Sequence, residues 1–258
     1  MKALFLVGVF IVSMSANAQQ TVRLYAAGSL RAVMTEVGAA YMQAMGHALS
    51  GEFGASGLLR ERLDKGEAAD VFASANMEHP QLLARSGKGG EVRMFTRNYL
   101  CALVRQDLQV NSANLLDLLL DRNIKLGTST PKADPSGDYA FELFAKAGAI
   151  RPGADVALRG RSQQLTGGPN SPQPPKDRNV YGMLVSEGRA DIFLTYCTNA
   201  LAAIRERPSL QMIQLPANLS VGAEYGLIAF TPAGAAFADF VVSPAAQSIF
   251  LKHGFAKP

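Results

Sequence analysis

Short apolar segments of strand character alternate with segments of helical periodicity along most of this 258-residue chain. Residues 22–27 are largely apolar, and from 30 to 45 apolar residues recur every three or four positions, as one face of a helix requires. Further strands are predicted at 49–53, 69–74, 99–104, 125–129, 191–196, 210–215 and 225–230, and helices at 58–65, 80–86, 115–120, 139–147, 180–187, 199–206, 235–241 and 244–253. This order predicts an α/β fold with mainly parallel sheets flanked by helices.

The first 20 residues have the features of a secretory signal peptide. Lys2 supplies a positive start, residues 3–14 are almost entirely apolar, and Ala16 and Ala18 form the small-x-small pattern of a cleavage site. A membrane anchor or a buried first helix is the alternative, but polar residues shorten the apolar run below the roughly 20 residues of a membrane span. We therefore expect residues 1–18 to be a cleaved signal peptide and the mature chain to be periplasmic.

Composition narrows the class of protein. Hydrophobic residues make up 48% of the chain and charged residues 18%, which disfavours intrinsic disorder. The net charge is +4 and Lys and Arg form no run, so nucleic-acid binding is not expected. No HExxH or CxxC spacing is present, and we expect neither a bound metal ion nor a cofactor.

The chain has two cysteines, Cys101 in a predicted strand and Cys197 directly after another. An even number of cysteines in an exported chain permits one disulfide, and two buried free thiols are the alternative. A catalytic thiol would need a histidine partner, and His47, His79 and His253 lie in unrelated contexts.

Small and polar residues occupy four turns between a predicted strand and the following helix. Ser29, Ser56 and Ser136 each precede or begin a helix, and so does the pair Arg178 and Asn179. A helix N-terminus carries unsatisfied N–H groups and a partial positive charge, so serines there suit a bound anion. Plain N-capping is the alternative for any one of them. Their repetition in two halves of an exported chain favours an anion held between lobes.

Six short motifs carry a resemblance to a known family. They are AAGSL (26–30), FGASGLL (53–59), ADVFASA (69–75), PSGDYA (135–140), the strand ending at Tyr196, and FLKHGF (250–255). With these motifs the sequence resembles the periplasmic molybdate-binding proteins of bacterial ABC importers over essentially the whole mature chain. The resemblance implies a two-lobed type II binding protein, with residues 19–98 and 231–258 in one lobe and 99–230 in the other. Hinges are then expected near 97–99 and 230–232.

The resemblance also implies a set of ligand contacts. Ser29 and Ser56 match serines that give a hydroxyl and a backbone N–H, Ser136 matches an alanine that gives its N–H, and Tyr196 matches a tyrosine whose phenol donates. An ungapped count places the remaining backbone contact at Arg178. Either only the N–H of Arg178 matters, or its guanidinium contacts the ligand and shifts preference to another oxyanion or a small organic anion. Serine in place of alanine at position 136 adds a hydroxyl, which also favours a shifted ligand preference.

The implied function is capture of a tetrahedral oxyanion, molybdate or tungstate, for an inner-membrane ABC permease by a protein that is commonly a monomer. A serine hydrolase is disfavoured, because the segment around Ser56 lacks the last glycine of a G-x-S-x-G elbow, so no enzyme activity is expected. The segment 166–177 contains four prolines and two glycines. It is either a plain surface loop or a loop overhanging the ligand cleft.

Overall fold

The computed structural model describes residues 20–172 and 178–258, and the predicted signal peptide lies outside these ranges. Its strands are β1 Thr21–Ala27, β2 Ala48–Gly54, β3 Val71–Ser74, β4 Arg93–Val104, β5 Leu126–Ser129, β6 Gln163–Thr166, β7 Ile192–Tyr196, β8 Gln211–Gln214 and β9 Gly222–Ala229. Its helices are a 3-10 turn at Gly28–Leu30, α1 Arg31–Met45, α2 Ser56–Asp64, α3 Glu78–Arg85, α4 Leu115–Leu120, α5 Pro135–Ile150, α6 Ala154–Arg161, α7 Val180–Ser186, α8 Cys197–Glu206, α9 Pro232–Val241 and α10 Pro244–Lys252.

Every strand and helix predicted from the sequence is present. Two further elements, α6 and β6, were not predicted. Helix α6 buries only Ala154 and Leu158, so its apolar period is too sparse to stand out. Strand β6 is polar and mostly exposed because it lies at the edge of the sheet. Strand β4 is also longer than predicted, since its first half, from Arg93, is rich in polar residues.

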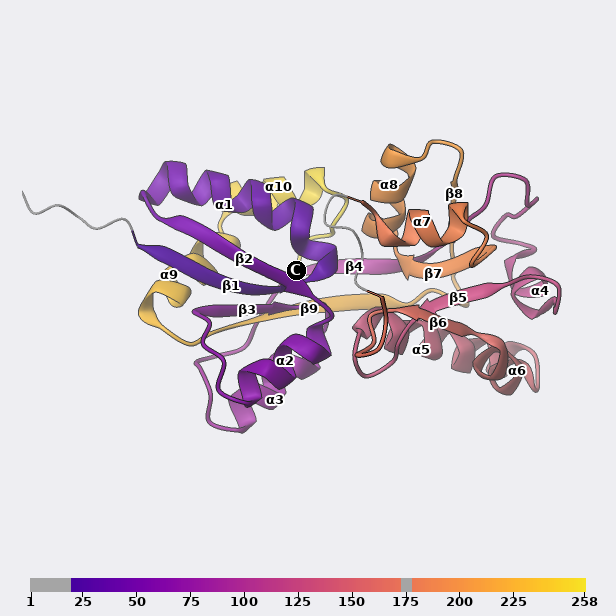
Figure 1. Ribbon diagram of the computed structural model, residues 1–258, viewed down its shortest axis with the longest axis horizontal. Helices are drawn as coiled ribbons and strands as arrows, with labels where there is room; N and C mark the ends of the chain where they lie inside the picture. Colours follow the sequence, from indigo (N-terminus) through magenta and orange to yellow (C-terminus); the bar gives the residue numbers. More distant parts are fainter. Residues whose placement is uncertain (1–19, 173–177) are drawn as a thin grey trace, which may run out of the picture.

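The described strands follow the path β2-β1-β3-β9-β4-β7-β5-β6, with β8 on the other side of β4. Strand β1 runs parallel to β2 and β3, and β5 runs parallel to β6 and β7. Strands β4 and β9 pair antiparallel with their neighbours, so each sheet is mixed rather than mainly parallel. The reason is that β4 and β9 connect the two halves in opposite directions, as Figure 1 shows.

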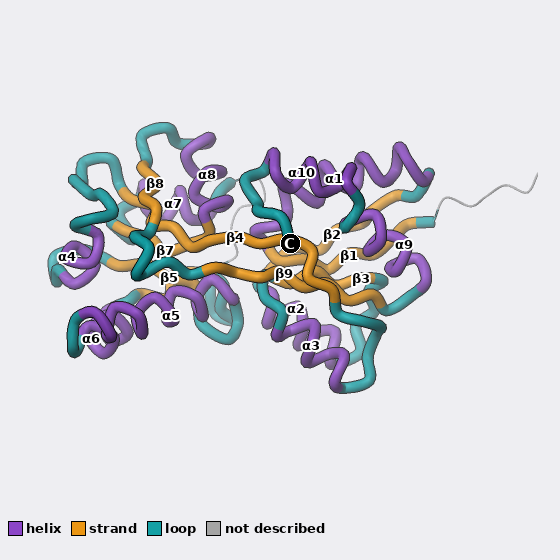
Figure 2. The backbone as a smooth tube through the Cα atoms, turned by 180° about the vertical axis from the view of Figure 1, so that it is seen from behind, coloured by secondary structure: helices purple, strands orange, loops and turns teal. Residues whose placement is uncertain are grey.

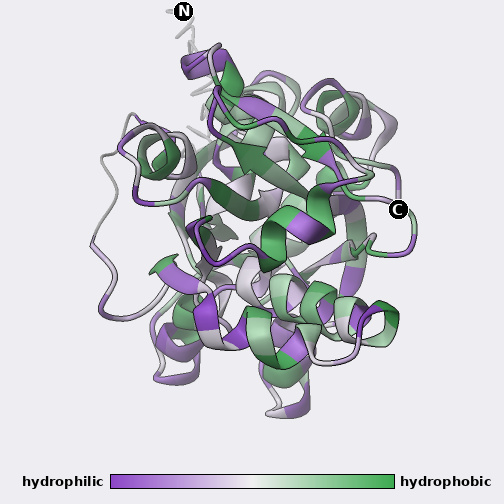
Figure 3. Cartoon of the chain, turned by 90° about the vertical axis from the view of Figure 1, so that its right-hand side faces the viewer, coloured by the Kyte–Doolittle hydropathy of each residue, from purple (hydrophilic) through white to green (hydrophobic). Residues whose placement is uncertain are grey.

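Each half of the molecule has helices on both faces of its sheet. In the first half α1, α9 and α10 pack on one face and α2 and α3 on the other, and in the second half α7 and α8 lie opposite α5 and α6 (Figures 1 and 2). The described buried apolar residues accordingly form four clusters, one under each helical layer. In Figure 3 the helices show alternating hydrophobic and hydrophilic segments, as expected for helices packed on one side.

Strands β4 and β9 define where the chain passes between the halves. Residues Arg93–Tyr99 of β4 pair with β9, while Leu100–Val104 pair with β7 and β8. Strand β9 also pairs with β3, so it belongs to the first sheet, and the boundary predicted at 230–231 would separate it from that sheet. We therefore propose a first lobe of 20–98 and 222–258, a second lobe of 99–221, and a return crossing near Val221.

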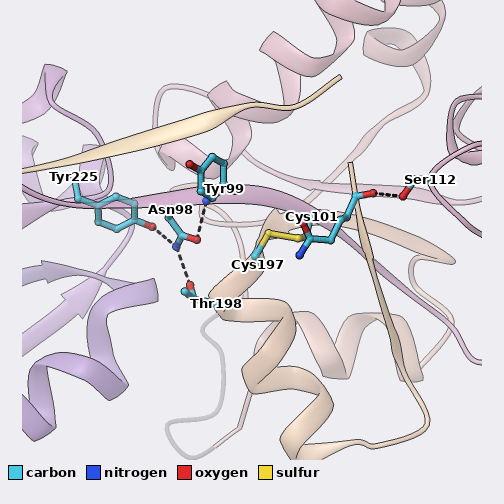
Figure 4. Close-up of a disulfide and its surroundings, with 8 residues drawn as sticks. Asn98, Tyr99, Cys101, Ser112, Cys197, Thr198 and Tyr225 are labelled. Atoms are coloured by element: carbon cyan, nitrogen blue, oxygen red, sulfur yellow. Dashed lines mark hydrogen bonds between the residues drawn. A yellow bond between two sulfur atoms is a disulfide. The ribbon is translucent and has the colours of Figure 1, made fainter. Parts of the chain in front are cut away.

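Cys101 and Cys197 form a disulfide, which confirms the first of the two alternatives. In the antiparallel register of β4 and β7, Leu100 pairs with Tyr196 and Cys101 with Thr195. Cys197 begins α8 directly after β7, and the turn of the chain there brings it to Cys101. The Cα atoms of the two cysteines are 4.9 Å apart and their sulfurs 2.00 Å apart (Figure 4). The bond fixes the start of α8 to the crossing strand β4.

Among residues 20–172 and 178–258, no single helix is long and apolar enough to cross a membrane. Helices α9 and α10 reach that length and composition only as a pair, bent by 61°.

Candidate functional site

The two serines of the first lobe lie at the carboxyl ends of adjacent parallel strands. Ser29 follows β1 in the 3-10 turn, and Ser56 is the first residue of α2 after β2. Within the described part of the chain no side chain caps either helical segment. Apart from the Gly57 N–H of α2, which donates to Ala133, their first N–H groups are available to a ligand. Ser29 is partly exposed, whereas Ser56 is buried and its hydroxyl accepts a hydrogen bond of 3.1 Å from the Ala75 N–H.

Tyr196 brings the second lobe to the same place. It is the last residue of β7, and its phenol donates to the Ala75 carbonyl over 3.2 Å. The peptide groups on the two sides of Ala75 thus contact Ser56 of the first lobe and Tyr196 of the second. Tyr196 also directly precedes α8, whose N-terminus has no side-chain cap among the described residues.

Three tyrosines surround the point where the lobes meet. The ring of Tyr196 lies 5.5 Å from that of Tyr225 on β9 and 6.1 Å from that of Tyr139 on α5, between centroids. Burial raises the pKa of all three phenols above the ordinary value of 10. They are therefore neutral hydrogen-bond donors at every pH at which the protein would work.

Ser136 differs from the prediction in how it is used. It is the second residue of α5, and its N–H donates over 3.1 Å to Oδ1 of Asp134, the N-cap of the same helix. The Ser136 N–H, which was predicted to face a ligand, therefore already donates to a carboxylate within the protein. The Ser136 hydroxyl is fully buried and has no partner among the described residues. A buried hydroxyl without a partner is costly, so this oxygen is the better candidate for a ligand contact.

Asp134 was not predicted as part of the site. Burial raises the pKa of its carboxyl to about 6, against the hydrogen bond from Ser136, which lowers it. Asp138 on the same helix raises it further. An Asp directly before a Pro at the first helical position is a sequence signal for an N-cap. This signal could have shown that Asp134 and a ligand compete for the Ser136 N–H.

The raised pKa of Asp134 predicts a pH-dependent stability. The carboxyl ionises near pH 3.8 in the unfolded chain and near 6 in the folded chain, so its contribution to stability is fully present below pH 3.8 and is lost as the pH rises to about 6. In the Asp134→Asn variant this loss is absent. Chemical unfolding should therefore show the variant gaining on the order of 2 kcal/mol relative to wild type between pH 4 and pH 7.5. A difference between variant and wild type that does not change with pH would contradict the assignment.

The side chain of Arg178 pairs with a carboxylate of the second lobe and not with another predicted site residue. Its exposed guanidinium forms an ion pair with Glu206, and the Asn179 N–H donates to the same carboxylate over 2.7 Å. Glu206 is the last residue of α8, roughly 13 Å along the helix from the residue after Tyr196. The Asn179 side chain caps α7 by accepting from Gly182. Nothing in this arrangement directs the guanidinium toward Tyr196.

The two lobes contact each other directly beside Ser56. The Gly57 N–H donates over 2.8 Å to the carbonyl of Ala133, in the second-lobe turn between β5 and α5. A Cβ at Gly57 would lie 2.3 Å from the carbonyl oxygen of Lys132 and 2.7 Å from that of Ala133. Lys132 has a φ of 67°, so this turn is held in an unusual conformation. Glycine is required here by the close approach of two backbones.

Part of the proline-rich segment packs against the same turn. Both the N–H and the hydroxyl of Thr130 donate to the Thr166 carbonyl, and Gly167 lies against the Asp134 carboxyl. Residues 173–177 lie outside the described residues, so the role of the loop over the cleft stays a prediction.

A cavity of about 530 Å³ lies at the lobe boundary, lined by residues 76–78 and by parts of β4, β9 and α5. Four carboxylates line it, those of Glu78, Asp138, Glu142 and Glu224. Arg97, the cation among its described lining residues, pairs with Glu224. This excess of carboxylates disfavours an anion. Ser29, Ser56 and Tyr196 therefore stay the better candidates for an anion site.

Comparison with known proteins identifies the family. A model of the bacterial extracellular solute-binding proteins matches residues 22–256. The chain belongs to this family. The solute-binding protein is 35% identical over 210 residues to an uncharacterised protein of Pasteurella multocida, which covers 81% of this chain and 87% of the relative.

Three solved structures share the fold of this solute-binding protein. The sulfate-binding protein of Mycobacterium tuberculosis has a TM-score of 0.77 at 18% identity, over 92% of this chain and 86% of that one. The periplasmic molybdate-binding protein of Azotobacter vinelandii has 0.72 at 17%, over 92% and 99%. A periplasmic binding protein of Actinobacillus pleuropneumoniae with bound fructose 6-phosphate has 0.71 at 13%, over 93% and 85%. These likenesses confirm the predicted α/β binding-protein fold.

Proposed function

We propose that this solute-binding protein captures a tetrahedral oxyanion, molybdate or tungstate, between its lobes and delivers it to an inner-membrane ABC permease. Ser29, Ser56 and Tyr196 support this proposal, because each lies at or just before a helix N-terminus that no side chain caps among the described residues. Ser56 and Tyr196 both contact Ala75, and Ser29 and Tyr196 both lie beside Tyr225. Hydroxyls and helix N–H groups are neutral donors that suit a charged oxygen, and the Tyr196 phenol joins them when its proton turns from the Ala75 carbonyl to the ligand. The role is binding and transport rather than catalysis.

The geometry supports binding by lobe closure. Ser29 and Ser56 belong to the first lobe, while Tyr196 and the hydroxyl of Ser136 belong to the second. An anion bonded to both sets stabilises the closed arrangement, in which Gly57 contacts Ala133. Each hydrogen bond to a charged oxygen contributes about 1.5–3 kcal/mol, so four or more offset the ordering costs of closure.

A different oxyanion or a small organic anion held by Arg178 is the alternative ligand. The ion pair between Arg178 and Glu206 argues against a role for the guanidinium. The ligands named for the three similar structures, sulfate, molybdate and fructose 6-phosphate, share a tetrahedral anionic group. That shared group is what the serine cluster is suited to hold.

Calorimetric titration of the mature protein tests the proposal. Molybdate, tungstate, sulfate, phosphate, fructose 6-phosphate and acetate are titrated at pH 7.5 under one buffer condition. Molybdate and tungstate are expected to bind at micromolar or lower concentration and to raise the melting temperature. Binding of fructose 6-phosphate or acetate without either metal oxyanion would replace the proposed ligand, and binding of none of the six would remove the function.

Replacing either first-lobe serine should weaken binding without unfolding the protein. Ser29→Ala and Ser56→Ala are each expected to raise the Kd for molybdate by about 10- to 100-fold, because each removes a hydrogen bond of about 1.5–3 kcal/mol to a charged oxygen. Ser243→Ala is the matched control, since Ser243 caps α10 far from the site and its loss should lower stability alone. Unchanged Kd values in both site variants would make these serines simple structural residues.

Arg178→Ala is expected to leave the affinity for molybdate within about twofold of wild type, because exposed ion pairs of this kind contribute little and the guanidinium faces Glu206. Calorimetry under the same conditions measures it. A tenfold loss would show instead that the side chain contacts the ligand in the bound protein.

A further inference from the structure

A chain of polar side chains links Ser29 to both crossing strands. The Ser29 hydroxyl lies 3.0 Å from the Tyr225 phenol, and Tyr225 lies on β9. The phenol in turn lies 3.2 Å from Nδ2 of Asn98 on β4. The same Nδ2 is 2.8 Å from the hydroxyl of Thr198 on α8 (Figure 4). Tyr225 and Asn98 are fully buried, so these contacts are not in competition with bulk water.

The direction of every hydrogen bond in this chain follows from one backbone group. The Tyr99 N–H donates over 2.9 Å to Oδ1 of Asn98, which fixes the other side-chain atom as the NH₂ group (Figure 4). An NH₂ group only donates, so its two hydrogens go to Thr198 and Tyr225. The Tyr225 oxygen therefore accepts from Asn98, and its single proton is left for Ser29.

The direction of these hydrogen bonds determines where the Ser29 hydroxyl proton points. The Ser29 oxygen accepts from Tyr225 and cannot send its own proton back along the chain. Because Ser29 is partly exposed and lies in the uncapped turn after β1, its proton is directed to the cleft. A chain of aligned donors also polarises each member and strengthens the last hydrogen bond.

We infer that Asn98 and Tyr225 are positioning residues that hold Ser29 as a donor toward the bound oxyanion. The inference rests on the proposed function. It implies that the oxygen of the anion that faces Ser29 is unprotonated and accepts the hydrogen bond. It also links the donor that contacts the ligand to Thr198, at the start of α8 in the second lobe.

Asn98→Asp tests the direction of the chain. The introduced carboxylate still accepts from the Tyr99 N–H, and the hydroxyls of Thr198 and Tyr225 can both turn to donate to it. The Tyr225 oxygen must then accept from Ser29, which turns the lone pairs of Ser29 toward the anion. The variant keeps every buried group paired, so it is expected to fold, as circular dichroism will show.

The reversal is separated from the added charge by a double-mutant cycle with Ser29→Ala, read as the Kd for tungstate by calorimetry. Asn98→Asp is expected to weaken tungstate binding about 30-fold or more in the wild-type background, and by about threefold or less in the Ser29→Ala background. Equal fold-losses in the two backgrounds would overturn the inference, because charge or structural damage acts on both.

A second variant keeps the test decisive if the first fails to fold. Tyr225→Phe removes the proton given to Ser29 and should weaken tungstate binding about three- to tenfold, with no further loss when Ser29 is already alanine. Equal losses in both backgrounds would again overturn the inference. If the wild-type protein bound neither tungstate nor molybdate, the proposed function would be overturned and this inference with it. If the wild type binds but the loss of affinity is the same in both backgrounds, only the inference is overturned.

Discussion

Replacing Gly57 with alanine is expected to weaken oxyanion binding about 100-fold while both lobes stay folded. The new methyl group would lie 2.3 Å and 2.7 Å from the backbone oxygens of Lys132 and Ala133, so the lobes could close only with a shift of one backbone. An overlap of this kind costs about 3 kcal/mol, which corresponds to about a hundredfold in affinity. The open protein is unaffected, because alanine is a better helix former than glycine at this second position of α2.

Gly28→Ala is the matched control for this experiment. A Cβ at Gly28 would meet only the Gly54 carbonyl oxygen, at 3.9 Å, which is ordinary contact distance. Calorimetry should therefore give a wild-type Kd for Gly28→Ala and a much higher one for Gly57→Ala, with similar melting temperatures in the absence of ligand. Equal affinities in the two variants would show that the contact between Gly57 and Ala133 is not part of the bound state.

Removal of the disulfide is expected to lower the free energy of unfolding by roughly 2–5 kcal/mol. The bond joins residues separated by 96 positions, and closing a loop of about that length removes much of the entropy of the unfolded chain. The variant Cys101→Ala with Cys197→Ala avoids leaving a buried polar group in the core beneath α8. Since the bond fixes the start of α8, anion affinity is expected to fall modestly as well.

Urea unfolding with and without a thiol reductant measures this effect. Wild type unfolded in reductant should approach the stability of the double variant, and the variant itself should not respond to reductant. A double variant as stable as the oxidised wild type would contradict the assigned role of the bond.

Local sequence patterns were enough to predict the strands and helices of this protein, because most of them bury one regular apolar face. Helix α6 and strand β6 were not predicted, because each buries too few residues to show a regular apolar pattern. The disulfide was left open because connectivity depends on which strands are neighbours. The pairing of β4 with β7 and the turn from β7 into α8 bring the two cysteines together.

The serine-bearing turns were also predictable, since Ser29 and Ser56 stand between a strand and a helix in the sequence itself. Tyr225 and Asn98 carry no such signal, because their position beside Ser29 depends on two strands that cross between the halves. The count that selected Arg178 was made along a proline-rich segment of irregular backbone. Its side chain faces Glu206 at the C-terminal end of α8, and the contact of its N–H with a ligand stays a prediction. Long-range packing, rather than local pattern, determines these positions.

A crystal structure of the mature protein with tungstate would locate the bound anion, since tungsten scatters X-rays strongly and anomalously. One strong anomalous peak is expected between the lobes, with the oxygens of the anion within hydrogen-bond distance of Ser29, Ser56 and the Tyr196 phenol. A peak in the carboxylate-lined cavity or beside Arg178, or no peak between the lobes, would contradict the proposed site.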